Sequence, residues 1–133
     1  MKSLAKLPAH IIRRLQPETL EQIAVMEWLR WTHPDIVDCV MHIPNERKQN
    51  KIWGLVLAHM GVLPGASDLF IAVPRKMFHG MFLEMKTKKG RLTENQKTFL
   101  QTMRSQGYQA TAAYGSDDAI CQINNYLKLP NVA

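Results

Sequence analysis

The chain has 133 residues, 46% of them hydrophobic, which suits a single domain with a substantial apolar core. Its 17 basic and 11 acidic residues give a formal net charge of +6, which favours an anionic partner such as nucleic acid. The sequence has no run of about 18 apolar residues, no secretory leader, and no cysteine or histidine spacing typical of a zinc site or disulfide framework. We therefore expect a cytoplasmic protein without a membrane span, whose histidines are structural.

Local signals predict a basic lead-in over residues 1–16 and one domain over 17–133. Pro17 is tolerated at the start of a helix, which we expect to continue to Trp31 and to end before Pro34. The later predicted elements are a strand over 36–43, a helix over 45–60, strands over 68–73 and 79–86, a helix over 93–106, a strand over 108–114, and a helix capped by Ser116 over 116–127. This order predicts an α/β domain with a mixed central sheet flanked by helices.

The two apolar runs over 68–73 and 79–86 read as the strands of a hairpin. If residues 74–78 form its loop, Val73 pairs with His79 and Asp68 falls opposite Glu84. Side chains alternate along a strand, so Glu84 and Lys86 share a face. Opposed like charges are unfavourable, and a hard divalent cation between the two carboxylates would offset them. With Lys86 as a fixed positive charge beside it, this pattern predicts a metal-dependent phosphodiesterase.

Glu84-Met85-Lys86, followed by Gly90-Arg91-Leu92-Thr93 and then Gln96, is the most specific pattern in the chain. Three further segments accompany it: Glu-Thr-Leu-Glu-Gln at 18–22, His-Ile-Pro-Asn-Glu-Arg at 42–47 and Gly-Ala-Ser-Asp-Leu at 65–69. Together they resemble the VRR-NUC branch of the PD-(D/E)XK nuclease superfamily, although Ser67 stands where that family usually has proline. The resemblance implies a restriction-endonuclease-like αβββαβ core, and the small stand-alone domains of this family are common in phages and bacteria.

The resemblance also implies a Mg²⁺ or Mn²⁺ site whose ligands are Asp68, Glu84 and the backbone carbonyl of Met85. Lys86 would orient or help to deprotonate the attacking water and would stabilise charge on the phosphate. The simpler alternatives are two solvated surface acids, and a lysine that only forms a salt bridge. The apolar flanks of both strands argue against the first alternative.

Two further positions are implied in catalysis. Glu18, in the first helix, would hold a water or a second ion, and Glu21 lies close enough to the same face to take that role instead. Gln96 would position the nucleophile or a phosphate. However, Thr93 and Gln96 also form a capping box, which alone would explain the glutamine.

Polar and basic side chains near these positions are predicted to contact DNA: Asn45, Arg47, Lys48, Lys51, Lys88, Lys89, Arg91 and Lys97. Because no zinc finger or helix-turn-helix is evident, we expect recognition of DNA structure, with a Holliday junction favoured and a homodimer making both cuts. The alternatives are a nuclease for flapped or nicked DNA or for RNA, and a non-catalytic nucleic-acid-binding module. Trp28, Trp31, Trp53 and Met60 exceed the needs of a small core, so they either form an interface or are all buried within one subunit.

Overall fold

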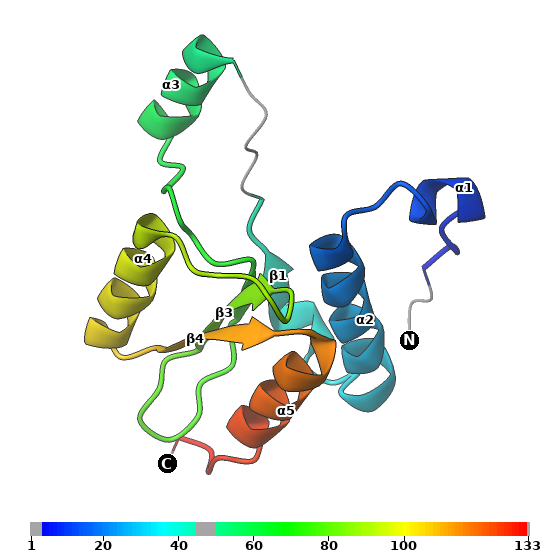
Figure 1. Cartoon of the computed structure of the whole chain (residues 1–133). Coiled ribbons are helices and arrows are strands. Elements are labelled where there is room, and N and C mark those ends of the chain that lie inside the picture. The colour runs from blue at the N-terminus through cyan, green and yellow to red at the C-terminus, as the bar shows by residue number, and fades with distance from the viewer. Residues whose placement is uncertain (1–3, 45–49, 133) are drawn as a thin grey trace.

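A computed structural model of the protein describes residues 4–44 and 50–132. Its centre is a four-stranded sheet between two layers of helices (Figure 1). Helices α2 (Pro17–Thr32) and α5 (Ser116–Leu127) cover one face, and α4 (Glu94–Ser105) covers the other. The predicted α/β class with a mixed sheet is therefore confirmed. None of the helices in the described part of the chain is long and apolar enough to cross a membrane.

The sheet has the order β1 (Val40–His42), β2 (Leu69–Ile71), β3 (Met81–Lys86) and β4 (Gln109–Tyr114). Pairing is antiparallel between the first three strands and parallel between β3 and β4, which α4 connects. In the hairpin, Leu69 pairs with Leu83 and Ile71 with Met81, so one further step places Asp68 opposite Glu84, as predicted. The ladder stops before Val73, because the amide of His79 donates to the carbonyl of Gly107.

β3 is buried along its whole length because helices cover both faces of the sheet. Met81, Leu83 and Met85 enter the core shared with α2 and α5, whereas Phe82 packs edge-on against Phe99 of α4. Since side chains alternate, Glu84 and Lys86 continue the row of Phe82 on the α4 side of the sheet. These two charged side chains are therefore only 2% and 6% exposed.

Several predicted boundaries are wrong. The strand predicted from residue 36 begins at Val40, because Val37–Cys39 forms a 3₁₀ turn that places Val37 and Cys39 against the core. Gly115, with a φ of +93°, occupies the cap position of α5, so Ser116 is the first helical residue and not the cap. The lead-in contains an unpredicted short helix, α1 (Ala9–Ile12).

Helix α3 (Lys51–His59) is shorter than predicted, and the predicted start at Asn45 lies outside the described residues. Asn50 caps α3 by accepting a hydrogen bond from the amide of Trp53. Of the four surplus apolar residues, Trp28 packs against the core, whereas Trp31, Trp53 and Met60 are exposed. Burial of all four within one subunit is therefore wrong.

Among the glycines, Gly65 lies closest to a neighbouring segment of the chain. Its φ is +83°, and a Cβ at this position would lie 2.3 Å from the backbone carbonyl carbon of Asn95. Only glycine allows the segment before Asp68 to lie directly against the first turn of α4. This contact brings the Asp68 segment and Gln96 together.

We expect Gly65→Ala to lower the free energy of unfolding by about 2 kcal/mol or more, through strain in the left-handed region and the backbone clash. Gly61→Ala is the matched control, because Gly61 has a φ of +104° but no atom within 4 Å of an added Cβ. The control should lose only about 1 kcal/mol. Urea titration of both variants measures the difference, and equal losses would contradict the close-approach argument.

Candidate metal centre

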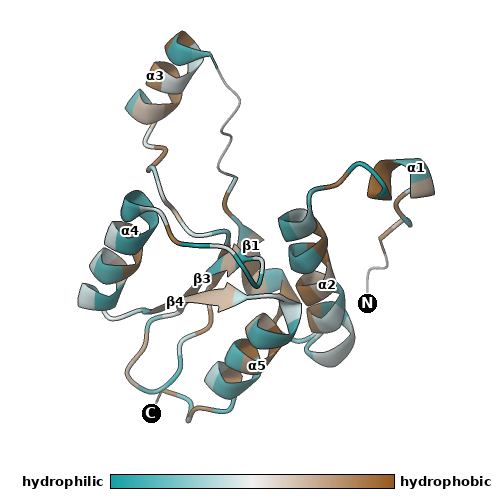
Figure 2. Ribbon diagram, viewed as in Figure 1, coloured by the Kyte–Doolittle hydropathy of each residue, from teal (hydrophilic) through white to brown (hydrophobic). Residues whose placement is uncertain are grey.

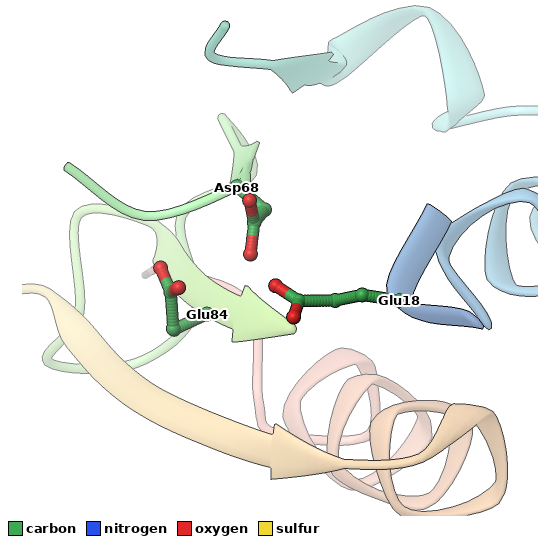
Figure 3. Close-up of side chains that lie close together, drawn as sticks. All are labelled: Glu18, Asp68 and Glu84. Carbon is green, nitrogen blue, oxygen red and sulfur yellow. The ribbon is translucent and has the colours of Figure 1, made fainter. Parts of the chain in front are cut away.

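Three carboxylates from separate parts of the chain converge at one end of the sheet (Figure 3). Glu18 comes from the first turn of α2, Asp68 immediately precedes β2, and Glu84 lies in β3. One oxygen from each lies within 4.8 Å of the others. Glu18 and Asp68 are half-buried and Glu84 is buried, so water does little to screen their repulsion. The donor set is entirely oxygen, which is the type that hard divalent cations prefer.

Asp68 is held against β3 by a hydrogen bond of 2.7 Å from the amide of Met85 to its Oδ2. Burial raises the pKa of the Asp68 carboxyl, and the Met85 amide and the nearby His42, Lys86 and Glu84 side chains oppose that rise. The amide and carbonyl of one strand residue point to the same edge. The Met85 carbonyl therefore lies on the edge that faces Asp68, on the side where the family resemblance implies a backbone ligand.

Lys86 and Gln96 both approach the same oxygen of the Glu84 carboxylate. The Nζ of Lys86 is 3.9 Å from Oε1 of Glu84, and the Nε2 of Gln96 donates to that same oxygen at 2.7 Å. The side-chain Oε1 of Gln96 also accepts a hydrogen bond from the backbone amide of Thr93. The hydroxyl oxygen of Thr93 in turn accepts one from the backbone amide of Gln96. The capping box and the contact with the acidic site are therefore compatible, because they use opposite ends of one side-chain amide.

The structure places Glu18, and not Glu21, beside Asp68 and Glu84. The Glu21 carboxylate instead accepts a hydrogen bond from the amide of Ser116 at the start of α5. Hydrogen bonding to Ser116 lowers the pKa of Glu21, and the positive charge of Lys88 adds to the effect. Glu21 thus joins the N-terminal ends of α2 and α5, where a negative charge is favourable.

His42 and Gln22 were not predicted to belong to the site, yet His42 contacts Asp68 and Gln22 contacts His42. The Nδ1 of His42 is 2.9 Å from the carbonyl oxygen of Asp68 and 3.0 Å from the Nε2 of Gln22. The contact links β1 and α2 to the Asp68 segment. Two features could have predicted these contacts. His42 lies at the end of the strand that pairs with β2, and Gln22 lies one helical turn after Glu18.

The predicted DNA contacts fall into three groups. Lys88, Lys89 and Arg91 are exposed in the segment that directly follows β3, close in sequence to Lys86. Lys97 lies on α4 and pairs with Glu94, whereas Lys51 lies on α3, away from the acids. Asn45, Arg47 and Lys48 lie outside the described residues.

A mixed sheet with acidic groups at the ends of β2 and β3, beside a buried lysine, offers a site suited to a divalent metal, and metal-dependent nuclease domains are one class of protein that uses such a site. A sequence model of the VRR-NUC domain matches residues 5–117, most of the chain. The chain belongs to the VRR-NUC domain family. A solved structure described as a VRR_NUC domain protein is 28% identical, with a TM-score of 0.78, and the match covers 89% of this chain and 93% of that one. Among curated proteins none matches.

The two contacts of Gln96, with Thr93 and with Glu84, can be tested separately. Thr93→Ala removes the hydroxyl that caps α4 and should lower the free energy of unfolding by about 1 kcal/mol. Gln96→Ala removes its half of the capping box and also the donor to Glu84. We expect only Gln96→Ala to weaken Mn²⁺ binding, by about 10- to 100-fold in calorimetric titration. Equal Mn²⁺ affinity in the two variants would show that Gln96 is a capping residue alone.

Proposed function

We propose that this protein is a Mg²⁺- or Mn²⁺-dependent endonuclease that hydrolyses phosphodiester bonds in DNA. The observation that carries the proposal is the convergence of Glu18, Asp68 and Glu84 beside Lys86. Acids so close together repel one another, and a bound cation would offset that repulsion. The basic residues that follow β3 supply an anion-attracting surface next to it.

The chemistry of the donors fits the proposed metal. Asp68, Glu84 and the Met85 carbonyl offer hard oxygen ligands, and no His or Cys side chain belongs to the acidic cluster in the described residues. The burial that raises the pKa of Asp68 disfavours a bare carboxylate and so favours a bound cation. When bound, a divalent ion stabilises negative charge on the phosphate and makes water a better nucleophile at neutral pH.

The protein's own groups have distinct roles in this proposal. Lys86, restrained near Glu84 and nearly excluded from solvent, orients water at the scissile phosphate and stabilises the charge that develops there. Gln96 is a positioning residue, because its amide fixes the orientation of the Glu84 carboxylate. Glu18 completes the acidic cluster from α2 and would hold a water or a second ion.

We further propose that branched DNA, with a four-way junction favoured, is the substrate of a homodimer. Lys88, Lys89 and Arg91 would contact phosphates without reading base sequence. A junction has two-fold symmetry, and paired cuts need two sites related by a matching axis. One chain supplies one acidic cluster in its described part, so a dimer supplies the second. Phosphate contacts from Asn45, Arg47, Lys48, Lys51 and Lys97 belong to the same proposal.

We expect Asp68→Asn, Glu84→Gln and Lys86→Ala each to lower the cleavage rate by about 100-fold or more, because each removes a metal ligand or a charge at the phosphate. Junction binding in a gel shift with Ca²⁺ should stay near the wild-type level, since phosphate contacts dominate affinity. Glu94→Gln is the matched control, because the exposed Glu94 lies two residues before Gln96 in α4 and pairs with Lys97, outside the acidic cluster. Near-normal cleavage by Glu84→Gln, or full wild-type activity after exhaustive chelation, would contradict the assignment of the metal site.

A second prediction concerns the substrate. With Mg²⁺ or Mn²⁺, the wild-type protein should cut a four-way junction faster than a flap, a linear duplex or a single strand. In a supercoiled cruciform plasmid it should linearise the molecule in one encounter, because two sites act together. Nicked circles alone, with a preference for flaps, would favour the flap-nuclease alternative. Binding without any cleavage would favour a non-catalytic nucleic-acid-binding module. Preferential cleavage of RNA would favour the alternative of an RNA nuclease.

A further inference from the structure

Helix α3 is apolar and stands away from the rest of the protein (Figures 1 and 2). Seven of the twelve residues from 52 to 63 are exposed large hydrophobic residues: Ile52, Trp53, Leu55, Val56, Met60, Val62 and Leu63. Ile52 is 77% exposed and Met60 is 72% exposed. Within the part of the chain that the structure describes, no helix or strand packs substantially against α3. We call residues 51–63 the arm.

The length and composition of the arm would not stabilise an isolated helix in water. α3 has nine residues, fewer than the roughly 12–15 that an isolated helix needs even with favourable residues. Gly54 lies in its interior, where an added Cβ would meet nothing within 4 Å. A glycine there weakens a lone helix but lets another helix or surface approach closely. The arm therefore has the properties of an element stabilised by packing against another molecule.

The same chain offers an apolar hollow beside the base of the arm. Leu63, the last residue of the arm, and Pro64 form one wall. Helix α4 forms the other through Asn95, Thr98, Phe99, Thr102 and Met103. The volume of the hollow is about 240 Å³, ample for a large apolar side chain. The α4 residues follow helical spacing, so they present one continuous face. That helix also carries Gln96, which contacts Glu84 on the side toward the sheet.

We infer that the arm of one subunit packs into the hollow of a second copy, and that this exchange joins the two active subunits. The inference rests on the proposed homodimeric function and supplies its interface. Each chain has both an arm and a hollow. In a dimer with a two-fold axis, each arm can therefore enter the partner's hollow. Because α4 reaches both the hollow and the acidic cluster, the exchange would also fix the separation of the two sites.

The chemistry of the arm favours a second copy over DNA. Residues 51–64 contain only two ionisable side chains, Lys51 and His59, whereas a DNA-binding surface concentrates positive charge. Depletion of charge with enrichment in Trp, Met and aliphatic residues is typical of the centre of a homodimer interface. A stable interface buries roughly 800 Å² per subunit. The exposed apolar side chains of the arm, together with a hollow on each subunit, are the surfaces available for such an interface.

Sedimentation tests the exchange through substitutions on both surfaces. The wild-type protein should sediment as two chains of 15.2 kDa, that is 30.4 kDa. Leu55→Glu in the arm and Thr102→Arg in the hollow should each weaken the dimer at least tenfold. Met77→Glu is the matched control, because Met77 is also an exposed apolar residue, at 76%, but lies in the β2–β3 loop. It should leave the dimer unchanged, and melting curves should show all three variants folded.

Cross-linking tests whether arm and hollow meet. In a Cys121→Ser background, which removes the exposed cysteine, a Trp53→Cys chain is mixed with a Thr102→Cys chain and oxidised gently. The mixture should form a covalent heterodimer, at least tenfold more than either chain forms alone. A Trp53→Cys chain that cross-links mainly to itself would overturn the exchange, because the two arms would then contact each other.

Failure of the inference and failure of the proposed function give different results. Leu55→Glu should still nick DNA with Mg²⁺ but lose the paired cuts, whereas Glu84→Gln should form the dimer and show the strongly lowered cleavage rate predicted above. A wild-type dimer that depends on the arm but never cleaves DNA would support the interface and contradict the proposed nuclease function. A wild-type monomer at high concentration would overturn the inference, and reduced junction binding by Leu55→Glu in that monomer would assign the arm to DNA.

Discussion

The site depends on the pairing of β2 with β3, which places Asp68 opposite Glu84 at the end of a buried ladder. Two acids at such a position repel each other, and burial removes the water that would otherwise screen them. The surroundings reduce this cost with an amide from Met85, an amide from Gln96 and the ammonium of Lys86. A remaining need for positive charge among the acids is what makes the end of the sheet suitable for a divalent cation.

Elements that look purely structural hold this arrangement in place. Gly65 lets the segment before Asp68 lie against the backbone of α4, and the capping box orients Gln96 toward Glu84. His42 contacts the carbonyl of Asp68 from the neighbouring strand. Each contact fixes the backbone or the orientation of a side chain that meets an acid, which explains how so small a fold can hold a precise site.

Gln96 shows why a local motif and a functional contact need not compete. A side-chain amide has an acceptor and a donor at opposite ends, and here the acceptor serves the helix start while the donor serves Glu84. Any change at this position therefore alters both helix stability and the orientation of the acid. The separation of Glu18 from Glu21 follows a different principle: three residues of helix rotation direct one acid to the sheet end and the other to α5.

By itself, the sequence determined the α/β order, the hairpin register and the Asp68, Glu84 and Lys86 set, because alternation along strands and helix capping are local rules. It could not determine that Glu18 and not Glu21 joins the acids, that His42 touches Asp68, or that Gly115 and not Ser116 caps α5. These outcomes depend on how α2, β1 and α5 pack around the sheet. The exposure of α3 was also decided only by the tertiary structure, since an apolar helix sequence reads the same whether its partner is its own core or another molecule.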